Sequence, residues 1–354
     1  FWVGSLGLRK PKLNFSDFIR AIQKVIKMFG KKEQIKQLNE LQPVLIFPYV
    51  IPYHDSNFIR TVNKYFISKE IKKVLKKHSS KNPILVTSAP VSDNIIGSLG
   101  ESCSVFYCVD DYSSMDGAFK SIPQLEKKLV EKADIVFAVS KFLIETRKTE
   151  SKEVYFAPQG VNTEHFTKTE KIAGRVINIK KPVIGFFGLI SEWIDLELIY
   201  KSVKAYPEYT FLIIGKSVRD LSRFNDCRNF VYLGAVDYKD LPEYASVIDV
   251  GLIPFEMNNV SIASNPLKLL EYFSLGIPVV STNLPEVEKF GSLVYTAKDT
   301  GEFINFIQTA VKEKDPDKTK VRVSTAKEYS WDSVTKKIFD LVLETESLKH
   351  KTFN

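Results

Sequence analysis

A lysine and a glutamate, three positions apart, follow a predicted helix start and could bind a phosphorylated ligand. Asn265 and Pro266 are typical of a helix N-terminus, where the amide hydrogen that proline lacks is not needed. The unpaired backbone N–H groups and the positive dipole end of such a helix attract anions. Lys268 lies in the first turns and Glu271 one turn further on. We therefore expect the amides and Lys268 to bind the phosphates of a nucleoside diphosphate, and Glu271 to bind its ribose hydroxyls.

The residues after this helix start continue an α–β pattern. Gly276 is typical of a helix end, and the apolar run Val279–Ser281 predicts a short buried strand. From Asn265 to Val280 the sequence reads Asn-Pro-Leu-Lys-(x)2-Glu-Tyr-(x)3-Gly-x-Pro-Val-Val. This pattern resembles the donor-binding signature of GT-B glycosyltransferases, in particular bacterial family 4 and family 1 polysaccharide enzymes of the teichuronic-acid type.

The resemblance covers most of residues 40–345 and implies an architecture. We expect an α/β chain with two doubly wound, Rossmann-like domains that face a cleft. Residues 1–168 would form an N-terminal acceptor-binding domain that lacks its first βα units, and residues 182–330 a C-terminal domain that binds a nucleotide-sugar donor. Residues 331–350, with Ser330 as the N-cap, would form a closing helix that crosses back to the first domain.

Apolar runs that alternate with helical stretches indicate two domains independently of the resemblance. Each run is almost continuously apolar, as expected of a parallel strand buried on both faces. Two blocks of alternating β and α segments indicate two doubly wound sheets. The first series comprises residues 44–47, 84–87, 105–109, 135–139 and 154–157. The second comprises residues 183–187, 210–214, 231–233, 250–253, 279–281 and 293–295.

Three further positions complete the donor site that the resemblance implies. Gly188 would let its loop approach the phosphates, Lys216 would add a positive charge, and backbone groups near Val236 would bind the base. Related enzymes carry an arginine and a lysine after the Gly188 loop, whereas this chain carries Glu192 and Asp195. Phosphate neutralisation therefore falls mainly to the helix start. The full predicted donor set is Gly188, Lys216, Val236, Ser264, Asn265, Pro266, Leu267, Lys268 and Glu271.

Two aspartates are the candidate catalytic residues. Asp110 and Asp111 follow the predicted strand 105–109, at the point where the resembling family carries an acceptor-side acidic or histidine residue. A carboxylate there could accept the proton of an attacking sugar hydroxyl as a general base, and Asp110 is the first choice. In a retaining enzyme Asp110 would instead orient the acceptor. The pair could also simply close the strand through an Asx turn or a helix cap. His54 is expected in a loop on the acceptor side.

We expect no cofactor and no metal. Asp315 and Asp317 spell the Asp-x-Asp associated with metal-dependent sugar transfer, but they lie in a charged connector rather than at a strand end. A lysine and a helix dipole can neutralise a diphosphate leaving group without a metal. The three cysteines are too few and too scattered for a disulfide framework or a zinc site, which favours a reducing compartment.

The charge distribution indicates an anionic partner. Residues 1–180 contain 29 Lys and Arg against 18 Asp and Glu, whereas the remainder contains 21 against 24. Residues 15–29 and 60–77 combine apolar residues at helical spacing with many lysines. In the second stretch the predicted apolar face is Val62, Phe66, Ile71, Val74 and Leu75, and the basic residues are Lys64, Lys69, Lys72, Lys73, Lys76 and Lys77.

Both basic stretches fit helices that cover a sheet, and their lysines fit a surface that faces anionic lipid. Nucleic acid is disfavoured, because no stacking aromatics interleave with the basic residues. No apolar run approaches the ~18 residues of a membrane span. We expect a cytoplasmic protein and leave open a peripheral position on the inner face of the cell membrane.

The leading prediction is a metal-independent hexosyltransferase of cell-envelope polysaccharide synthesis. It would move a sugar, with UDP as the most frequent carrier, to a glycan or a lipid-linked acceptor. Many retaining members of the resembling family place a second glutamate eight residues before the ribose-binding one, where this chain has Ala263, so the stereochemical outcome stays open. The alternatives are a GT-B nucleotide-sugar epimerase and a non-catalytic glycan-binding protein that keeps the fold.

Overall fold

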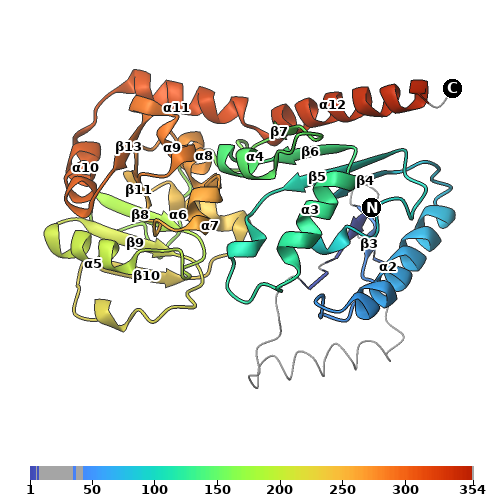
Figure 1. The fold of residues 1–354 in the computed structure, drawn as a ribbon. Coiled ribbons are helices and arrows are strands. Elements are labelled where there is room, and N and C mark those ends of the chain that lie inside the picture. The colour runs from blue at the N-terminus through green and yellow to red at the C-terminus, as the bar shows by residue number, and fades with distance from the viewer. Residues whose placement is uncertain (5, 8–34, 37–42, 353–354) are drawn as a thin grey trace. The chain divides into compact units, whose positions relative to one another are not determined.

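The computed structural model describes residues 1–4, 6–7, 35–36 and 43–352, and the chain divides into two units that Figure 1 draws as separate sheets with their helices. The first unit comprises Phe1–Val139, Leu143–Phe156 and Asp340–Asn354, and the second comprises Ser140–Phe142 and Ala157–Phe339. Residues 157–168, which we expected in the first domain, therefore belong to the second unit.

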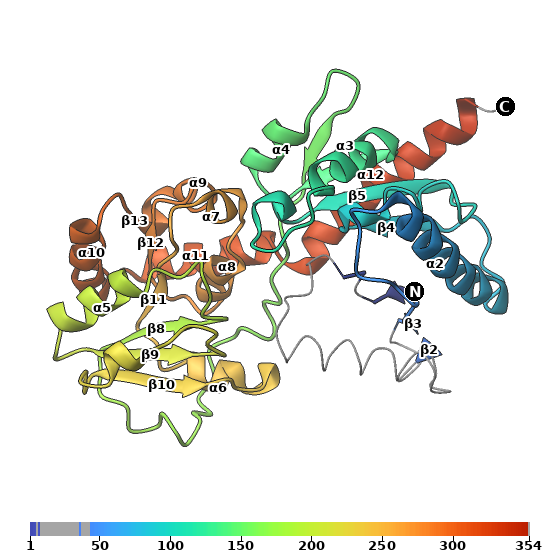
Figure 2. The same cartoon turned by 60° about the horizontal axis from the view of Figure 1, so that its bottom comes forward.

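The second unit contains one parallel six-stranded sheet (Figure 2). Its strands are β8 (Val183–Phe187), β9 (Thr210–Ile214), β10 (Phe230–Gly234), β11 (Val250–Ile253), β12 (Val279–Thr282) and β13 (Val294–Ala297). Their spatial order is β10-β9-β8-β11-β12-β13, which is the strand order of a dinucleotide-binding Rossmann sheet. The chain reverses direction across the sheet between β8 and β11, and ligands of such sheets bind outside the carboxyl ends of the strands there. All six predicted strands of the second series are confirmed.

Helices cover both faces of this sheet because its strands are apolar on both sides. Along β8, Ile184 and Phe186 pack into one core, whereas Val183 and Phe187 pack into the other. The first core includes side chains of α5 (Leu196–Ala205) and α10 (Thr300–Lys312). The second includes side chains of α6 (Leu241–Ala245), α8 (Leu267–Ser274), α9 (Pro285–Glu288) and α11 (Pro316–Glu328). The short helix α7 (Asn259–Ala263) lies between β11 and α8 in the chain.

The first unit contains a parallel four-stranded sheet in chain order and a separate three-stranded sheet. The larger sheet comprises β4 (Ile84–Thr87), β5 (Cys103–Cys108), β6 (Ile135–Ala138) and β7 (Val154–Phe156). The smaller comprises β1 (Trp2–Val3), β3 (Leu45–Ile46) and β2 (Ile35–Lys36), with β2 antiparallel to β3. The predicted strand 44–47 thus pairs outside the series in which we placed it. An apolar run indicates burial, but it does not specify the strand that it bonds to.

Helices α2 (Asn57–Lys77), α3 (Ile122–Lys132) and α4 (Lys141–Arg147) complete the first unit. Ile71, Val74 and Leu75 of α2 are buried as predicted. The prediction was wrong at Phe66, which is 40% exposed, and it missed Ile67, which is buried in its place. Ile67 lies four residues before Ile71 and so continues the buried stripe, whereas Phe66 does not. The other basic stretch, residues 15–29, lies outside the described residues.

The last helix, α12 (Trp331–Thr352), begins where the sequence predicts. The Ser333 backbone N–H donates to Ser330 Oγ at 3.3 Å, so Ser330 acts as the expected N-cap. Residues of α12 from Asp340 on belong to the first unit, where Lys349 Nζ pairs with Asp134 Oδ2 at 2.7 Å. Short 3-10 helices occur at Pro90–Ser92 (η1), Tyr112–Ser114 (η2), Ser222–Phe224 (η3), Tyr238–Asp240 (η4) and Gly291–Leu293 (η5). None of the described helices combines the length and apolarity of a membrane span.

Candidate functional site

The predicted donor residues gather at the carboxyl edge of the six-stranded sheet. Gly188 directly follows β8, Lys216 follows β9, Val236 follows β10, and α8 begins after β11 and α7. Backbone hydrogen bonds tie the first three loops together: Gly188 N–H donates to Ile214 O, and Ile190 N–H donates to Lys216 O, both at 2.9 Å. The residues that we assigned to one site from sequence therefore lie at one edge of one sheet, beside its topological switch point.

Two glycines allow these loops to approach closely. Gly188 and Gly215 have φ angles of 150° and 137°, in a region that other residues rarely adopt. A Cβ on Gly215 would lie 1.8 Å from Gly188 O, and a Cβ on Gly188 would lie 3.2 Å from Lys268 Cε. The bare backbone at Gly188 thus makes room for the stem of Lys268, which is a more specific role than the phosphate approach that we predicted.

Helix α8 starts and ends as a helix built to present its first turn. Pro266 occupies the N-cap rather than the first helical position, one residue earlier than proline usually prefers. At the other end, Gly276 N–H donates to Phe273 O at 2.9 Å and Ile277 N–H donates to Tyr272 O at 3.0 Å. With φ of 69° at Gly276, these two bonds form a Schellman motif. The predicted stop at Gly276 is confirmed.

Lys268 and Glu271 form an ion pair on one face of α8. Lys268 Nζ lies 2.6 Å from Glu271 Oε2, and the side chains are 27% and 5% exposed respectively. The ammonium also lies 5.1 Å from the centre of the Phe187 ring at the end of β8, within reach of a cation–π attraction. The predicted phosphate and ribose ligands are therefore direct neighbours. Lys216 is exposed and forms no ion pair with any described residue.

A stacked pair of aromatic residues beside this site was not predicted from the sequence. The rings of His165 and Tyr238 lie 4.1 Å apart at 17°, and His165 Nε2 lies 2.9 Å from the Tyr238 carbonyl oxygen, to which it donates. Burial raises the pKa of Tyr238, and the charge of Glu271 raises it further, so Tyr238 lies near the ribose-binding candidate. The two residues are 73 positions apart, and no sequence spacing connects them.

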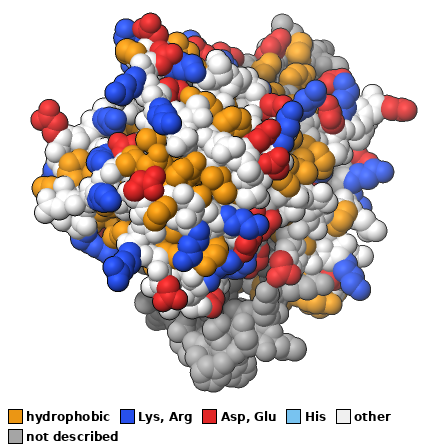
Figure 3. Space-filling view, turned by 90° about the vertical axis from the view of Figure 1, so that its left-hand side faces the viewer, with side chains coloured by type: hydrophobic (Ala, Val, Ile, Leu, Met, Phe, Trp, Pro, Cys, Tyr) orange, Lys and Arg blue, Asp and Glu red, His pale blue; other side chains and the backbone are white. Residues whose placement is uncertain are grey.

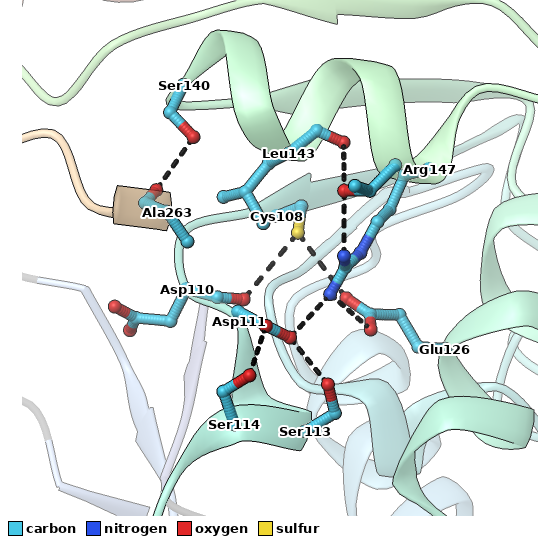
Figure 4. Close-up of polar contacts among 11 residues, drawn as sticks. Cys108, Asp110, Asp111, Ser113, Ser114, Glu126, Ser140, Leu143, Arg147 and Ala263 are labelled. Carbon is cyan, nitrogen blue, oxygen red and sulfur yellow. Dashed lines mark hydrogen bonds and ion pairs between the residues drawn. The ribbon is translucent and has the colours of Figure 1, made fainter. Parts of the chain in front are cut away.

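Asp110 follows β5 at the carboxyl edge of the four-stranded sheet. Its side chain is half-buried, and Figure 4 shows its carboxylate pointing away from the guanidinium of Arg147. Its carbonyl oxygen accepts from Cys108 Sγ at 3.7 Å. Asp110 is thus fixed through its backbone while its carboxylate points elsewhere, which is compatible with the role of general base that we predicted.

Asp111 has a different environment. Its two carboxylate oxygens accept hydrogen bonds from Ser113 Oγ at 2.6 Å and Ser114 Oγ at 2.5 Å, and Arg147 Nη2 donates to Oδ1 at 2.7 Å. Burial raises the pKa of Asp111, but these three hydrogen bonds lower it by more, so the pKa lies below its ordinary value. A buried carboxylate that is held by three donors is a poor proton acceptor. Asp111 therefore holds η2 in place, and we withdraw it as the second candidate base.

Glu126 completes this buried cluster in the first unit. Arg147 Nη2 donates to Glu126 Oε2 at 3.0 Å, and Cys108 Sγ donates to Oε1 at 3.4 Å. Burial raises the pKa of Glu126, although Arg147 opposes the shift, and burial likewise raises the pKa of the Cys108 thiol. We define the Arg147 cluster as Cys108, Asp111, Glu126 and Arg147 (Figure 4). Its one sequence signal was missed: Glu126 occupies the apolar face of α3 between Leu125 and Leu129.

His54 is enclosed rather than open to an acceptor. It is 3% exposed, and its Nε2 lies 3.0 Å from Leu6 O and 3.1 Å from Gly7 O, so Nε2 is the donor. Its ring packs edge-on against Phe119 at 5.2 Å. Burial lowers the pKa of His54. These contacts identify a neutral histidine that ties two segments together, so an acceptor-side role has no support in its geometry.

The Asp-x-Asp sequence is a helix cap. Asp315 Oδ1 accepts from the backbone N–H groups of Asp317 and Lys318 at 3.1 and 3.0 Å, and Asp317 pairs with Lys320 at 3.2 Å in the exposed first turn of α11. Within the described part of the chain, no group of three or more His, Cys, Asp or Glu side chains could hold a metal ion. The aspartates thus do structural work that the sequence pattern alone does not distinguish from metal binding.

Ala263 closes the end of α7 next to the donor helix. The residue is fully buried, and its carbonyl oxygen accepts from Ser140 Oγ at 2.7 Å. Figure 4 shows this bond at the start of α4. A glutamate side chain at this position would have to displace its packed neighbours, so the departure from the retaining pattern is built into the packing around α7.

Known proteins match this chain in part. Residues 181–313 match the family described as glycosyl transferases group 1. The "putative teichuronic acid biosynthesis glycosyltransferase TuaH" of Bacillus subtilis (strain 168) is 30% identical over 207 residues, which are 54% of this chain and 51% of that protein. An uncharacterized 41.2 kDa protein in the cps region of Klebsiella pneumoniae is 28% identical over 193 residues, 51% of each chain. The chain spans about half the length of the curated relatives it matches.

Solved structures share the fold. Sucrose-phosphate synthase of Thermosynechococcus elongatus superposes with a TM-score of 0.70 at 13% identity, over 98% of each chain. Anabaena HepE, in complex with UDP and glucose, superposes with a TM-score of 0.61 at 14% identity, over 78% of this chain and 82% of that one. The chain has the GT-B fold, and the resemblance to GT-B glycosyltransferases that its sequence carries is confirmed.

Proposed function

We propose that this GT-B chain is a glycosyltransferase that moves a sugar from a UDP-sugar to a glycan or a lipid-linked acceptor in the synthesis of a surface polysaccharide. The observation that carries the proposal is the Lys268–Glu271 pair at the start of α8, 2.6 Å apart and packed against the Gly188 loop. A cation and a carboxylate at a helix N-terminus match the two ends of a ribose-diphosphate. The relative from Bacillus subtilis and the UDP complex of HepE support the substrate class.

The donor would bind along the carboxyl edge of the six-stranded sheet. Lys268 has three ammonium hydrogens and one carboxylate partner, so it can donate to a phosphate and remain beside Glu271. Glu271 Oε1 and Oε2 can accept from the two ribose hydroxyls, because charged acceptors form the stronger hydrogen bonds. The base would lie near Val236, where the ring of Tyr238, 56% exposed, offers an aromatic face.

Asp110 is our proposed general base. The acceptor hydroxyl oxygen forms a bond to the anomeric carbon, the bond from that carbon to the diphosphate breaks, and UDP leaves with the electron pair. The hydroxyl proton passes to the Asp110 carboxylate. Lys268 and the first amides of α8 would stabilise the charge that develops on the leaving diphosphate. In a retaining reaction Asp110 would orient the acceptor instead, because the leaving diphosphate itself can take the proton.

Ligand binding to the folded state tests the donor assignment. A ligand that binds only the native protein raises its stability with occupancy. We expect UDP, and one UDP-sugar in a panel of UDP-, GDP- and TDP-sugars, to raise the unfolding temperature, in the presence or absence of EDTA. No shift with any nucleoside diphosphate would contradict the proposal, and a shift that EDTA abolishes would contradict its metal-independence.

An Asp110→Asn variant tests the catalytic assignment separately. We expect turnover, measured as UDP release, to fall by roughly 10²–10⁴-fold, whereas the thermal shift with UDP stays unchanged because the donor residues lie in the other unit. Asp116→Asn is the matched control, since this aspartate lies six residues further along the same connection and we assign it no role in the reaction. Equal turnover in both variants would remove Asp110 from the mechanism.

The proposed acceptor also has consequences for location. A lipid-linked glycan is presented at a membrane surface, and nucleotide sugars are made in the cytoplasm. We therefore propose that the chain works on the cytoplasmic side, in contact with an anionic membrane.

A further inference from the structure

The solvent-facing side of α2 combines aromatic rings with lysines. Phe58, Tyr65 and Phe66 expose 78%, 60% and 40% of their surface. Exposed lysines follow them toward the end of the helix. We call the set of Phe58, Tyr65, Phe66, Lys69, Lys72, Lys73, Lys76 and Lys77 the α2 surface. Figures 1 and 2 both draw α2 at the outer side of the first unit's strands.

Helical spacing places these side chains on one face. Phe58, Tyr65, Lys69, Lys72 and Lys76 are separated by seven, four, three and four residues, so they form one row along α2. Phe66, Lys73 and Lys77 form a second row beside it. The buried residues of the helix lie on the opposite side, in the core of the first unit. At 1.5 Å per residue, the α2 surface is roughly 30 Å long, with rings toward its N-terminal half and lysines toward its C-terminal half.

The lysines of the α2 surface are not neutralised by acidic neighbours. None of them forms an ion pair with a described residue, and Lys69 Nζ lies 5.6 Å from the centre of the Tyr65 ring. Glu70 is the one acidic residue of α2, and its Oε2 is enclosed by the protein. The face of the second unit in Figure 3 differs, because basic and acidic side chains alternate across it. The α2 surface is therefore a local concentration of positive charge beside exposed rings.

We propose that the α2 surface docks on an anionic lipid bilayer, with its rings in the headgroup layer and its lysines on lipid phosphates. Aromatic side chains favour the membrane–water interface, and each lysine near an anionic leaflet strengthens binding about fivefold at low salt. Neither interaction needs a pocket of matched shape, and the α2 surface has none. An acidic protein would use the lysines but would leave Phe58 in water. This inference deepens the proposed function, since it names the surface that would meet a membrane-held acceptor.

Neutral variants of the lysines test the electrostatic part. Wild-type protein should sediment with vesicles of phosphatidylglycerol and phosphatidylcholine, and not with phosphatidylcholine alone. The binding should weaken as salt rises, because charges at a surface are screened within a Debye length. Lys69→Gln, Lys72→Gln, Lys73→Gln and Lys76→Gln together should weaken binding about a hundredfold or more. The matched control changes four other exposed lysines, Lys127, Lys128, Lys336 and Lys337, to glutamine and should bind like wild type.

Tryptophan substitutions test the insertion of the rings. In Phe58→Trp, the added fluorescence should shift to shorter wavelength with anionic vesicles and be quenched by brominated lipid tails. Phe156→Trp is the control, because Phe156 is 45% exposed on β7 and carries no lysine row. Its emission should not respond. Both substitutions exchange one exposed aromatic side chain for another, so the fold is retained and each variant gives a result.

Several outcomes would overturn the proposal. These are absent vesicle binding, equal binding to neutral vesicles, equal loss in both glutamine quadruple variants, and a Phe58→Trp emission that ignores lipid. Binding to polyglutamate that is as tight as binding to anionic vesicles would point to an acidic protein partner instead. No nucleotide enters these assays, and the donor assays contain no lipid. A failure of the α2 surface and a failure of the donor site are therefore distinguishable.

Discussion

The two units hold buried carboxylates in different ways. In the Arg147 cluster, one guanidinium, 12% exposed, serves both Asp111 and Glu126, each 6% exposed. In the donor unit, Glu271 is equally buried, but its partner Lys268 is 27% exposed and serves one carboxylate. Arginine's planar fork is saturated by its two partners, whereas lysine keeps ammonium hydrogens for a ligand. The difference separates a cluster that holds the structure from a pair that can bind.

Removal of Arg147 should have the largest effect on stability. Arg147→Ala would leave two carboxylates buried without their counter-ion, which typically costs about 3–5 kcal/mol in the free energy of unfolding. Lys268→Ala is the comparison, and it should cost less than about 1 kcal/mol because the lysine is partly solvated. Urea unfolding of the two variants measures both values. Similar losses would mean that the two ion pairs do not differ in the way we describe.

A compensated variant sharpens this prediction. Arg147→Met combined with Asp111→Asn and Glu126→Gln removes every charge of the cluster and keeps the side-chain volumes similar. Buried ion pairs that are replaced as a unit are often neutral in stability, so the triple variant should recover most of the loss. If it is as unstable as Arg147→Ala, the loss came from packing of the arginine stem rather than from the uncompensated carboxylates.

Glu271→Ala should weaken donor binding rather than the fold. The loss of hydrogen bonds from the ribose hydroxyls to a charged acceptor should reduce UDP affinity by about 1.5–3 kcal/mol, measured by titration calorimetry. The molecule contains a matched control in Glu286, which is as buried and pairs with Lys289 three residues later at 2.7 Å. Glu286→Ala should leave UDP affinity unchanged. Equal losses in both variants would show that the effect comes from the fold of the second unit.

The sequence was most informative where one local pattern defines both an element and a site. The strands of the second unit and the helix end at Gly276 follow from apolar runs and turn residues, and Lys268 and Glu271 share a face because their spacing is helical. The Arg147 cluster was missed because its members come from three elements, and only tertiary packing brings them together. His54 shows the converse, since its residue type suggested chemistry that burial removes. The strand at β3 was found, but its pairing was not, because register is a non-local property.

Lys268→Ala should discriminate between ligands. If the ammonium binds phosphate, the variant should lose about 1–2 kcal/mol of affinity for UDP and almost none for uridine, since part of its charge is already solvated. The same two titrations on Lys289→Ala serve as the control, because that lysine has the same pairing and a similar exposure of 31%. An equal loss for UDP and uridine would identify Lys268 as a structural partner of Glu271 and would make the two ion pairs of this unit equivalent.

The pH dependence of the Arg147 cluster should give the smallest effect, with a defined sign. Burial raises the pKa of Asp111, but hydrogen bonds from Ser113, Ser114 and Arg147 lower it by more, so the folded pKa lies below the ordinary value of about 3.9. As pH falls, the unfolded chain binds this proton first. The stabilisation from Asp111 is therefore complete above its unfolded pKa and is lost as pH falls through its folded pKa.

Glu126 has the opposite sign, and this separates the two carboxylates. Burial raises its pKa despite Arg147, so the folded chain binds the Glu126 proton before the unfolded chain does, and acidification from neutral pH favours the fold until Glu126 is protonated in both states. The stability of wild type relative to Glu126→Gln should therefore rise as pH falls toward about 4.3. Relative to Asp111→Asn, it should fall below about pH 4. Urea unfolding of the three proteins between pH 7 and pH 3 measures both differences. If neither changes with pH, the two groups do not titrate differently from those of the unfolded chain, and the contrast with the solvated Lys268–Glu271 pair would then be one of position alone.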